Sequence, residues 1–156
     1  MKSKRGKTAK AGKADLRVLE SSCVASNLRK SAHIVSRIYA KEMASAPIRG
    51  PLFSLLASIH RCGPETITAI AQDLGLDRTT LTRNLEPLKR RGLIEIRKMG
   101  ANRKEIRLLP KGETTLHKSL EFWRRAQTRV VSELGEARWN RMRNDLRAVM
   151  ALDTRQ

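Results

Sequence analysis

The chain has 156 residues, enough for one domain or for two small lobes that share a core. Its 33 Lys and Arg residues outnumber 15 Asp and Glu residues, and the resulting net charge of +18 favours a polyanionic partner. Aromatic residues make up only 3% of the chain, too few for the stacking platforms that bind single-stranded nucleic acid. We therefore expect the partner to be duplex DNA. No apolar run is long enough for a membrane span, and no apolar segment follows the basic N-terminus as in a secretory signal. We therefore expect a cytoplasmic protein with no membrane partner.

The sequence carries few of the features that catalysis requires. It has three histidines, no nucleophile that a motif pairs with a base, and no glycine-rich phosphate loop. Cys23 and Cys62 are far apart and lack the spacing of metal ligands, which also favours a reducing compartment. We expect a protein that is not an enzyme and that needs neither a metal nor another cofactor.

The N-terminal part is predicted to be a basic tail followed by a long helix. Residues 1–14 hold too little apolar surface to fold, and they form either a solubilising end or an arm that contacts phosphates. Residues 15–46 are assigned to a dimerisation region, with a helix expected from about Leu16 to Met43. Its apolar stripe has helical spacing. The stripe consists of Val24, Leu28, Val35, Ile38 and Tyr39.

Residues 47–110 are predicted to form a DNA-binding lobe that begins with two short helices. Pro51 suits the first turn of a helix that buries one apolar side and ends before Gly63. The residues expected on that side are Leu52, Leu55, Leu56 and Ile59. The next helix begins near Thr66 and runs to Leu74, and Gly75 supplies the tight turn that follows.

The next helix has the pattern of a recognition helix. Asp77 is placed to cap its first turn, and Pro87 predicts a kink or an early loosening. One face is apolar and must be buried; it carries Leu81, Leu85 and Leu88. The opposite face suits a polyanion and carries Thr79, Thr82, Arg83, Glu86 and Arg90.

A β-hairpin is predicted after the recognition helix, because apolar and polar residues alternate in two short runs. Ile94 and Ile96 mark the first strand, and Ile106 and Leu108 mark the second. Its tip is expected to project five basic residues: Arg97, Lys98, Arg103, Lys104 and Arg107. A basic hairpin beside a helix-turn-helix is typical of a wing.

Residues 111–156 are assigned to a second dimerisation region of two helices. The first is expected to run from after Pro110 to about Leu134, and Gly135 separates it from the last helix. The two helices carry more apolar surface than a small winged lobe can cover, so we expect them to pack against a second copy of the chain.

Three segments together resemble the MarR family of regulators: residues 75–83, 88–94 and 108–112. The resemblance extends over residues 23–152. It implies a mainly α fold with a small β-hairpin wing, in which winged helix-turn-helix lobes form a triangular homodimer. It also implies a sequence-specific transcriptional regulator, a repressor at palindromic operators that is released by a small organic ligand. An oxidation-sensing repressor and a ligand-independent architectural DNA-binding protein are the alternatives.

The DNA-contacting residues are predicted from the outward face of the recognition helix and from the wing. They are Arg78, Thr79, Thr80, Thr82, Arg83, Arg90, Asn102, Arg103 and Lys104. The family often has Asp-x-Arg at the wing tip, where an ungapped match places Gly100 and Asn102, and a slip of one residue brings Arg103 into the arginine position. The family also often has a capping Thr where this chain has Leu109.

The small-molecule effector is expected to bind among polar and aromatic side chains near the apolar stripes. The candidates are His33, Ser36, Tyr39 and His60, and the alternative for each is a purely structural role. Oxidation sensing would act through Cys23. In the resemblance, however, the sensing-cysteine position of the peroxide-responsive branch is occupied by Ala25.

Overall fold

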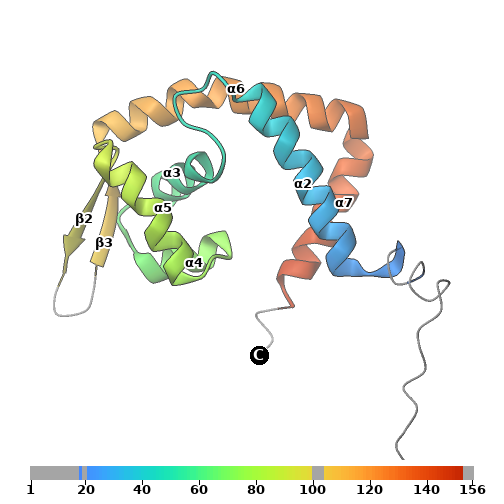
Figure 1. The fold of residues 1–156 in the computed structure, drawn as a ribbon, viewed down its shortest axis with the longest axis horizontal. Helices are drawn as coiled ribbons and strands as arrows, with labels where there is room; N and C mark the ends of the chain where they lie inside the picture. The colour runs from blue at the N-terminus through green and yellow to red at the C-terminus, as the bar shows by residue number, and fades with distance from the viewer. Residues whose placement is uncertain (1–17, 19–20, 100–103, 153–156) are drawn as a thin grey trace, which may run out of the picture. The chain divides into compact units, whose positions relative to one another are not determined.

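The computed structural model describes residue 18 and residues 21–99 and 104–152 (Figure 1). It separates into two units, residues 1–36 and 37–156. The predicted DNA-binding lobe and the C-terminal helices belong to the same unit. The tail over residues 1–14 lies outside the described residues, as do Asn102 and Arg103.

The predicted N-terminal helix is interrupted at Cys23. α2 spans Val24–Glu42, and Ser21 and Ser22 are helical, but Cys23 between them and α2 is not. The Asn27 side-chain amide donates to the carbonyls of Ser21 and Cys23, both at 2.9 Å. Such side-chain bonds compete with the backbone pattern of a helix, which explains the break at Cys23. The predicted start near Leu16 lies outside the described residues.

α3 spans Pro51–Cys62, as predicted, and its apolar side packs in the core of the second unit. Leu55, Leu56 and Ile59 are fully buried, whereas Leu52 is only half-buried. Phe53, which the periodicity did not single out, is buried in its place. Gly63 ends the helix with a φ of 72°, a left-handed conformation that glycine adopts without steric cost.

α4 (Ile67–Leu74) and α5 (Arg78–Arg90) form the helix-turn-helix. The Thr66 hydroxyl caps α4 by accepting from the Ala69 N–H at 3.2 Å. Gly75 makes the turn with φ 60° and ψ 34°, and α5 continues for three residues beyond Pro87. The expected turn and both helices are therefore confirmed.

The described strands form an antiparallel sheet in the order β1-β3-β2. β2 (Ile94–Lys98) and β3 (Lys104–Leu108) are the predicted hairpin, with Ile96 opposite Ile106. β1 (Glu65–Thr66) pairs with β3 and was not predicted, because two residues are too few for an alternation pattern.

α6 (Pro110–Leu134) and α7 (Glu136–Met150) follow the hairpin (Figure 1). Leu109 precedes α6 and provides no side-chain cap, as its apolar side chain implied. The core of the second unit brings together the inner faces of α3, α4 and α5, the sheet, and Leu116 of α6. α7 has no buried residue. None of the described helices is long and apolar enough to cross a membrane.

Candidate nucleic-acid interface

The start of α5 is held by its predicted cap. The Thr80 N–H donates to Asp77 Oδ1 at 2.8 Å, and the Thr80 hydroxyl donates to Asp77 Oδ2 at 2.6 Å. These two bonds lower the pKa of the Asp77 carboxyl, and the bond from the Thr80 side chain has the larger effect. The negative charge also lies at the positive end of the helix dipole, which strengthens the cap. Asp77 thus fixes the first turn of α5.

The inner face of α5 fixes its rotation about the helix axis. Leu81, Leu85 and Leu88 are each at most 1% exposed and pack into the core. Burying each such side chain contributes about 1.5–3 kcal/mol. Because this face is committed to the core, the opposite face of α5 points to solvent.

The outer face of α5 forms a shallow, open groove. Its lining consists of Arg78, Thr79, Thr82, Arg83 and Glu86. All five side chains are exposed, and the Thr82 hydroxyl donates to the Arg78 carbonyl at 2.8 Å. Guanidinium and hydroxyl groups on an exposed helix face can contact base edges and phosphates in a major groove.

Two other predicted residues of α5 lie outside this lining. Thr80 is half-buried and its hydroxyl serves the Asp77 cap, so its first role is to position the helix. Arg90 is exposed in the last turn. Arg91 follows it and donates from Nη2 to the Pro47 carbonyl at 2.8 Å, which ties the end of α5 to the loop before α3.

The wing places two lysines directly opposite each other. Lys98 of β2 pairs with Lys104 of β3, and both are exposed. Like charges in directly opposed positions repel, so a phosphate between them would relieve the repulsion. The rest of the predicted tip, Asn102 and Arg103, lies outside the described residues.

One basic residue assigned to the wing tip lies elsewhere. Arg107 is half-buried and stands opposite Glu95, towards the base of the hairpin. The same Glu95 forms an ion pair with Arg97, whose Nε lies 3.0 Å from Glu95 Oε2. The expectation that Arg107 projects from the tip is wrong, because the strand register places it three pairs away from Lys104 and Lys98.

A polar cluster that the sequence analysis missed joins α3 to α4. The buried Ser58 hydroxyl donates to Asp73 Oδ2 at 2.6 Å, and Arg61 forms an ion pair with Asp73 Oδ1. The Ser58 bond and then the Arg61 bond lower the pKa of the Asp73 carboxyl. The cluster holds the helix that precedes the recognition helix. Only the spacing of Ser58 and Arg61 on one side of α3 hinted at it.

Solved structures of DNA-binding regulators have the same fold. The family model that matches describes a helix-turn-helix domain and covers residues 43–97. This chain is similar in structure to a MarR-family transcriptional regulator from Rhodococcus sp. RHA1, with a TM-score of 0.74 and 18% identity. The similarity covers 83% of this chain and 94% of the Rhodococcus chain. The M. tuberculosis transcriptional regulator MosR, in complex with DNA, is 31% identical over 86% of this chain and 100% of its own, with a TM-score of 0.76.

The chain belongs to the MarR family of winged helix-turn-helix regulators. It is a DNA-binding transcriptional regulator. CouR from Rhodococcus jostii RHA1, bound to p-coumaroyl-CoA, has a similar fold, with a TM-score of 0.71, 18% identity, and coverage of 83% of this chain and 93% of its own. No curated protein sequence matches this MarR regulator.

The candidate effector residues of this MarR regulator lie in different surroundings. His33 and Ser36 are exposed on α2, in the N-terminal unit. Tyr39 is half-buried, its hydroxyl hydrogen-bonds Gln127 Oε1, and its burial raises the pKa of the phenol. His60 is exposed on α3, and its ring packs edge-on against His117 with 5.7 Å between the ring centroids. Tyr39 and His60 therefore each have a partner that also fits a structural role.

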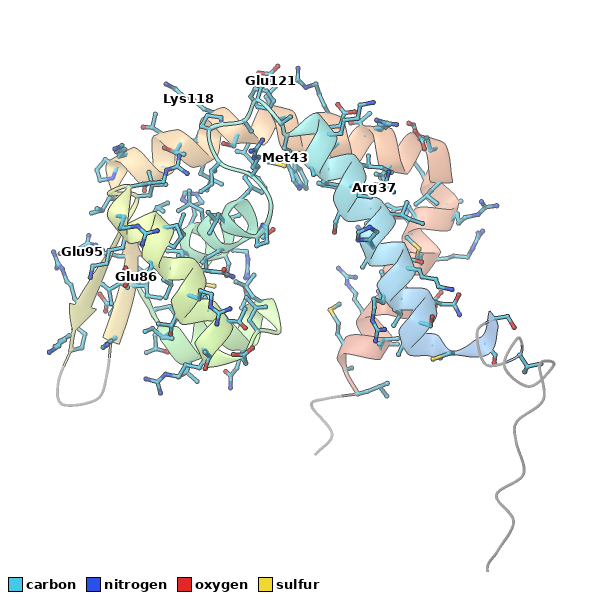
Figure 2. All side chains as sticks on the ribbon, in the orientation of Figure 1. Arg37, Met43, Glu86, Glu95, Lys118 and Glu121 are labelled. Atoms are coloured by element: carbon cyan, nitrogen blue, oxygen red, sulfur yellow. The ribbon has the colours of Figure 1, made fainter. Side chains whose placement is uncertain are left out.

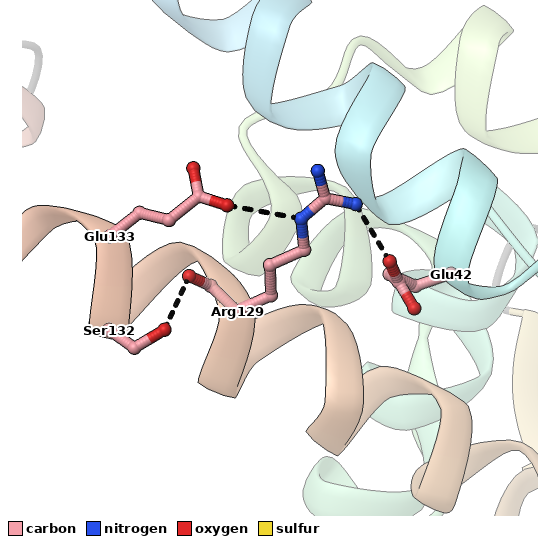
Figure 3. Close-up of polar contacts among 4 residues, drawn as sticks. All are labelled: Glu42, Arg129, Ser132 and Glu133. Atoms are coloured by element: carbon pink, nitrogen blue, oxygen red, sulfur yellow. Dashed lines mark hydrogen bonds and ion pairs between the residues drawn. The ribbon is translucent and has the colours of Figure 1, made fainter.

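The last turn of α2 is joined to α6 in this MarR regulator by Arg129 (Figure 3). Arg129 Nη1 lies 2.8 Å from Glu42 Oε1, and its Nε lies 3.2 Å from Glu133 Oε1. Hydrogen bonds to Glu42 and then Glu133 raise the pKa of the guanidinium. The bridge adds to the Tyr39–Gln127 bond between the same two helices.

The two cysteines of this MarR regulator are free thiols, and both are half-buried. Cys23 immediately precedes α2, and Cys62 ends α3. Within the described part of the chain, no group of three or more His, Cys, Asp and Glu side chains is arranged to hold a metal ion.

Proposed function

We propose that this MarR regulator is a homodimeric repressor that binds a palindromic operator and is released by a small organic ligand. Recognition of an operator is supported by the exposed groove of α5, in which Arg78 and Arg83 have no acidic partner among the described residues. An arginine on a major-groove helix can make two hydrogen bonds to guanine. The lysine pair of the wing supplies nearby phosphate contacts.

Selection of binding sites from a random duplex library tests operator recognition. We expect wild-type protein to enrich a sequence whose two half-sites are related by a two-fold axis, since a symmetric dimer presents two copies of α5. Arg83→Ala should weaken binding to the selected site by about 1–3 kcal/mol and should affect random duplex less. Enrichment of no sequence at all would favour an architectural, sequence-independent protein.

The homodimer is proposed from the apolar surface of α7. Val149 and Met150 on this helix are 40% and 66% exposed, and Leu152 just beyond it is 62% exposed. Trp139 and Leu146 of the same helix are only half-buried. Large apolar side chains left exposed on one helix favour a protein partner, and a second copy would cover the same helix on both chains. Sedimentation equilibrium should give twice the chain mass of 17.6 kDa.

Release by a small organic ligand is proposed from the family and from a bound relative. CouR, of the same fold, is bound to p-coumaroyl-CoA, an aromatic acid joined to coenzyme A as a thioester. A gel-shift titration of the selected duplex with aromatic acids and their coenzyme A thioesters tests this proposal. We expect at least one of them to release the protein.

The same gel-shift assay separates the ligand from an oxidation signal. We expect hydrogen peroxide to release wild-type protein poorly, and the double variant Cys23→Ser, Cys62→Ser to bind the duplex and to respond to the ligand as the wild type does. Release of the wild type but not of the double variant by peroxide would establish the thiol mechanism instead.

A further inference from the structure

The recognition groove contains a carboxylate among its basic residues. Glu86 (Figure 2) is the single acid of α5. It lines the same groove as Arg78, Thr79, Thr82 and Arg83. Its side chain is exposed. A negative charge on this face repels phosphates, so it lowers affinity for DNA of any sequence. A carboxylate on this face can instead accept a hydrogen bond from the amino group of a base.

Glu86 is not neutralised by the arginines next to it. Arg83 lies three residues before it and Arg90 four residues after it, at spacings that place side chains side by side on a helix. Neither forms an ion pair with Glu86 in the described structure, although Arg129 does pair with Glu133 four residues away on α6. The Glu86 carboxylate therefore remains available to accept hydrogen bonds.

The chemistry of the major groove limits which base a carboxylate can contact. Guanine presents the acceptors N7 and O6, and thymine presents the acceptor O4, all of which repel a carboxylate. Adenine offers an amino donor beside the N7 acceptor. Cytosine offers its N4 amino group with no acceptor of its own beside it, so it is the best partner for Glu86.

We propose that Glu86 is a specificity-determining residue that accepts a hydrogen bond from the N4 amino group of a cytosine in each half-site. This inference rests on the proposed recognition of an operator by α5. Glu86 lies about 4.5 Å along the helix axis from Arg83, close to the spacing of one base-pair step. The cytosine is therefore expected within one or two base pairs of the base that Arg83 contacts.

Site selection with matched variants tests the assignment. Each of four proteins is used to select binding sites from a random duplex library: wild type, Glu86→Gln, Glu86→Ala and the control Glu136→Gln. Glu136 is an exposed acid in the first turn of α7. We expect wild type and the control to enrich the same cytosine, Glu86→Ala to lose preference at that position alone, and Glu86→Gln to shift it towards adenine. Both Glu86 variants should bind random duplex more tightly.

The outcomes distinguish this inference from the function on which it rests. If the wild type enriches a motif and both Glu86 variants enrich the identical motif, the inference is wrong and operator recognition stands. If the wild type enriches no motif, operator recognition and the inference are both wrong.

A change to one base then isolates the hydrogen bond. In the selected duplex, the assigned cytosine is replaced by 2-pyrimidinone, which lacks only the 4-amino group. We expect wild-type affinity to fall about 10-fold and Glu86→Ala affinity to stay within about 2-fold, as a direct contact requires. Equal losses in the two proteins would overturn the contact, since they would reflect the altered base pair alone.

Discussion

The Ser119 hydroxyl of α6 accepts a hydrogen bond from the Ile48 N–H at 3.2 Å, and it donates one to the Thr115 carbonyl at 2.8 Å. Ser119 is fully buried and Ile48 is 2% exposed. This pair fixes the loop before α3 against α6. Because the Arg91 guanidinium donates to Pro47 in the same loop, the loop links the end of the recognition helix to α6.

Removal of this hydroxyl should destabilise the fold. Ser119→Ala leaves the buried N–H of Ile48 without a partner, and we expect a loss of about 1–3 kcal/mol in the free energy of unfolding. Urea denaturation measures it. Ser132→Ala is the control, because that exposed hydroxyl bonds within the described residues to the Arg129 carbonyl of its own helix (Figure 3). An equal effect of the two changes would show that the Ile48 bond contributes nothing of its own.

Gly112 in the first turn of α6 should not tolerate a side chain. A Cβ atom there would overlap the Leu93 carbonyl oxygen and would lie 2.8 Å from Leu108 Cδ1. The same carbonyl accepts the Leu109 N–H at 3.0 Å, so a shift would also disturb the start of α6. Gly112→Ala should lower the free energy of unfolding by about 1–3 kcal/mol, as overpacking does.

The neighbouring exposed residue provides the control for the Gly112 change. Lys111→Ala adds no atoms and should leave the urea midpoint nearly unchanged. A Gly112→Ala protein as stable as Lys111→Ala would show that α6 moves away from Leu93 at no cost.

The cluster around Asp73 should make stability depend on acid pH. Its bonds to Ser58 and Arg61 lower the pKa of Asp73 in the folded protein below its unfolded value of about 3.9. The resulting stabilisation is complete above the unfolded pKa and is lost as the pH falls through the folded pKa. We expect the wild type to lose more stability between pH 5 and pH 3, values that span the unfolded pKa of about 3.9, than Asp73→Asn does.

Urea midpoints across that range measure the Asp73 contribution. Asp145→Asn, at an exposed position of α7, should follow the wild-type pH dependence. If Asp73→Asn follows it as well, the Asp73 carboxylate does not stabilise the fold through its charge.

Lys104 should contribute to DNA binding through charge alone. Each phosphate contact that is lost reduces the slope of log K against log salt by about 0.9 on duplex DNA. We expect Lys104→Ala to weaken binding to selected and random duplexes alike and to reduce this slope by about that amount. The fold should not be weakened, because the change removes the repulsion with Lys98.

Lys118 of α6 gives the matched control for Lys104 (Figure 2). It is an exposed lysine on a helix that carries none of the proposed DNA contacts. A Lys118→Ala protein with the same reduction in slope would show that the effect follows net charge and not the position on the wing.

Local chemistry was enough to determine the recognition helix and most of its surface. The Asp77 cap, the Gly75 turn and the leucine face of α5 depend on residues within a few positions of one another, so their pattern predicts the observed structure. The same holds for the outward Arg83 and for the hairpin strands. The break at Cys23 in the predicted N-terminal helix was missed, because the competing bonds of Asn27 were not anticipated.

Contacts between distant segments were decided by the tertiary structure alone. The pairing of β1 with β3, the approach of Gly112 to Leu93 and the Ser58–Asp73 bond join residues 15 or more positions apart. No periodicity records which of many distant partners a short strand, a glycine or a hydroxyl will meet, because that choice follows from how the buried faces of the helices and the sheet pack together. Register also moved Arg107 away from the wing tip and left Lys98 facing Lys104.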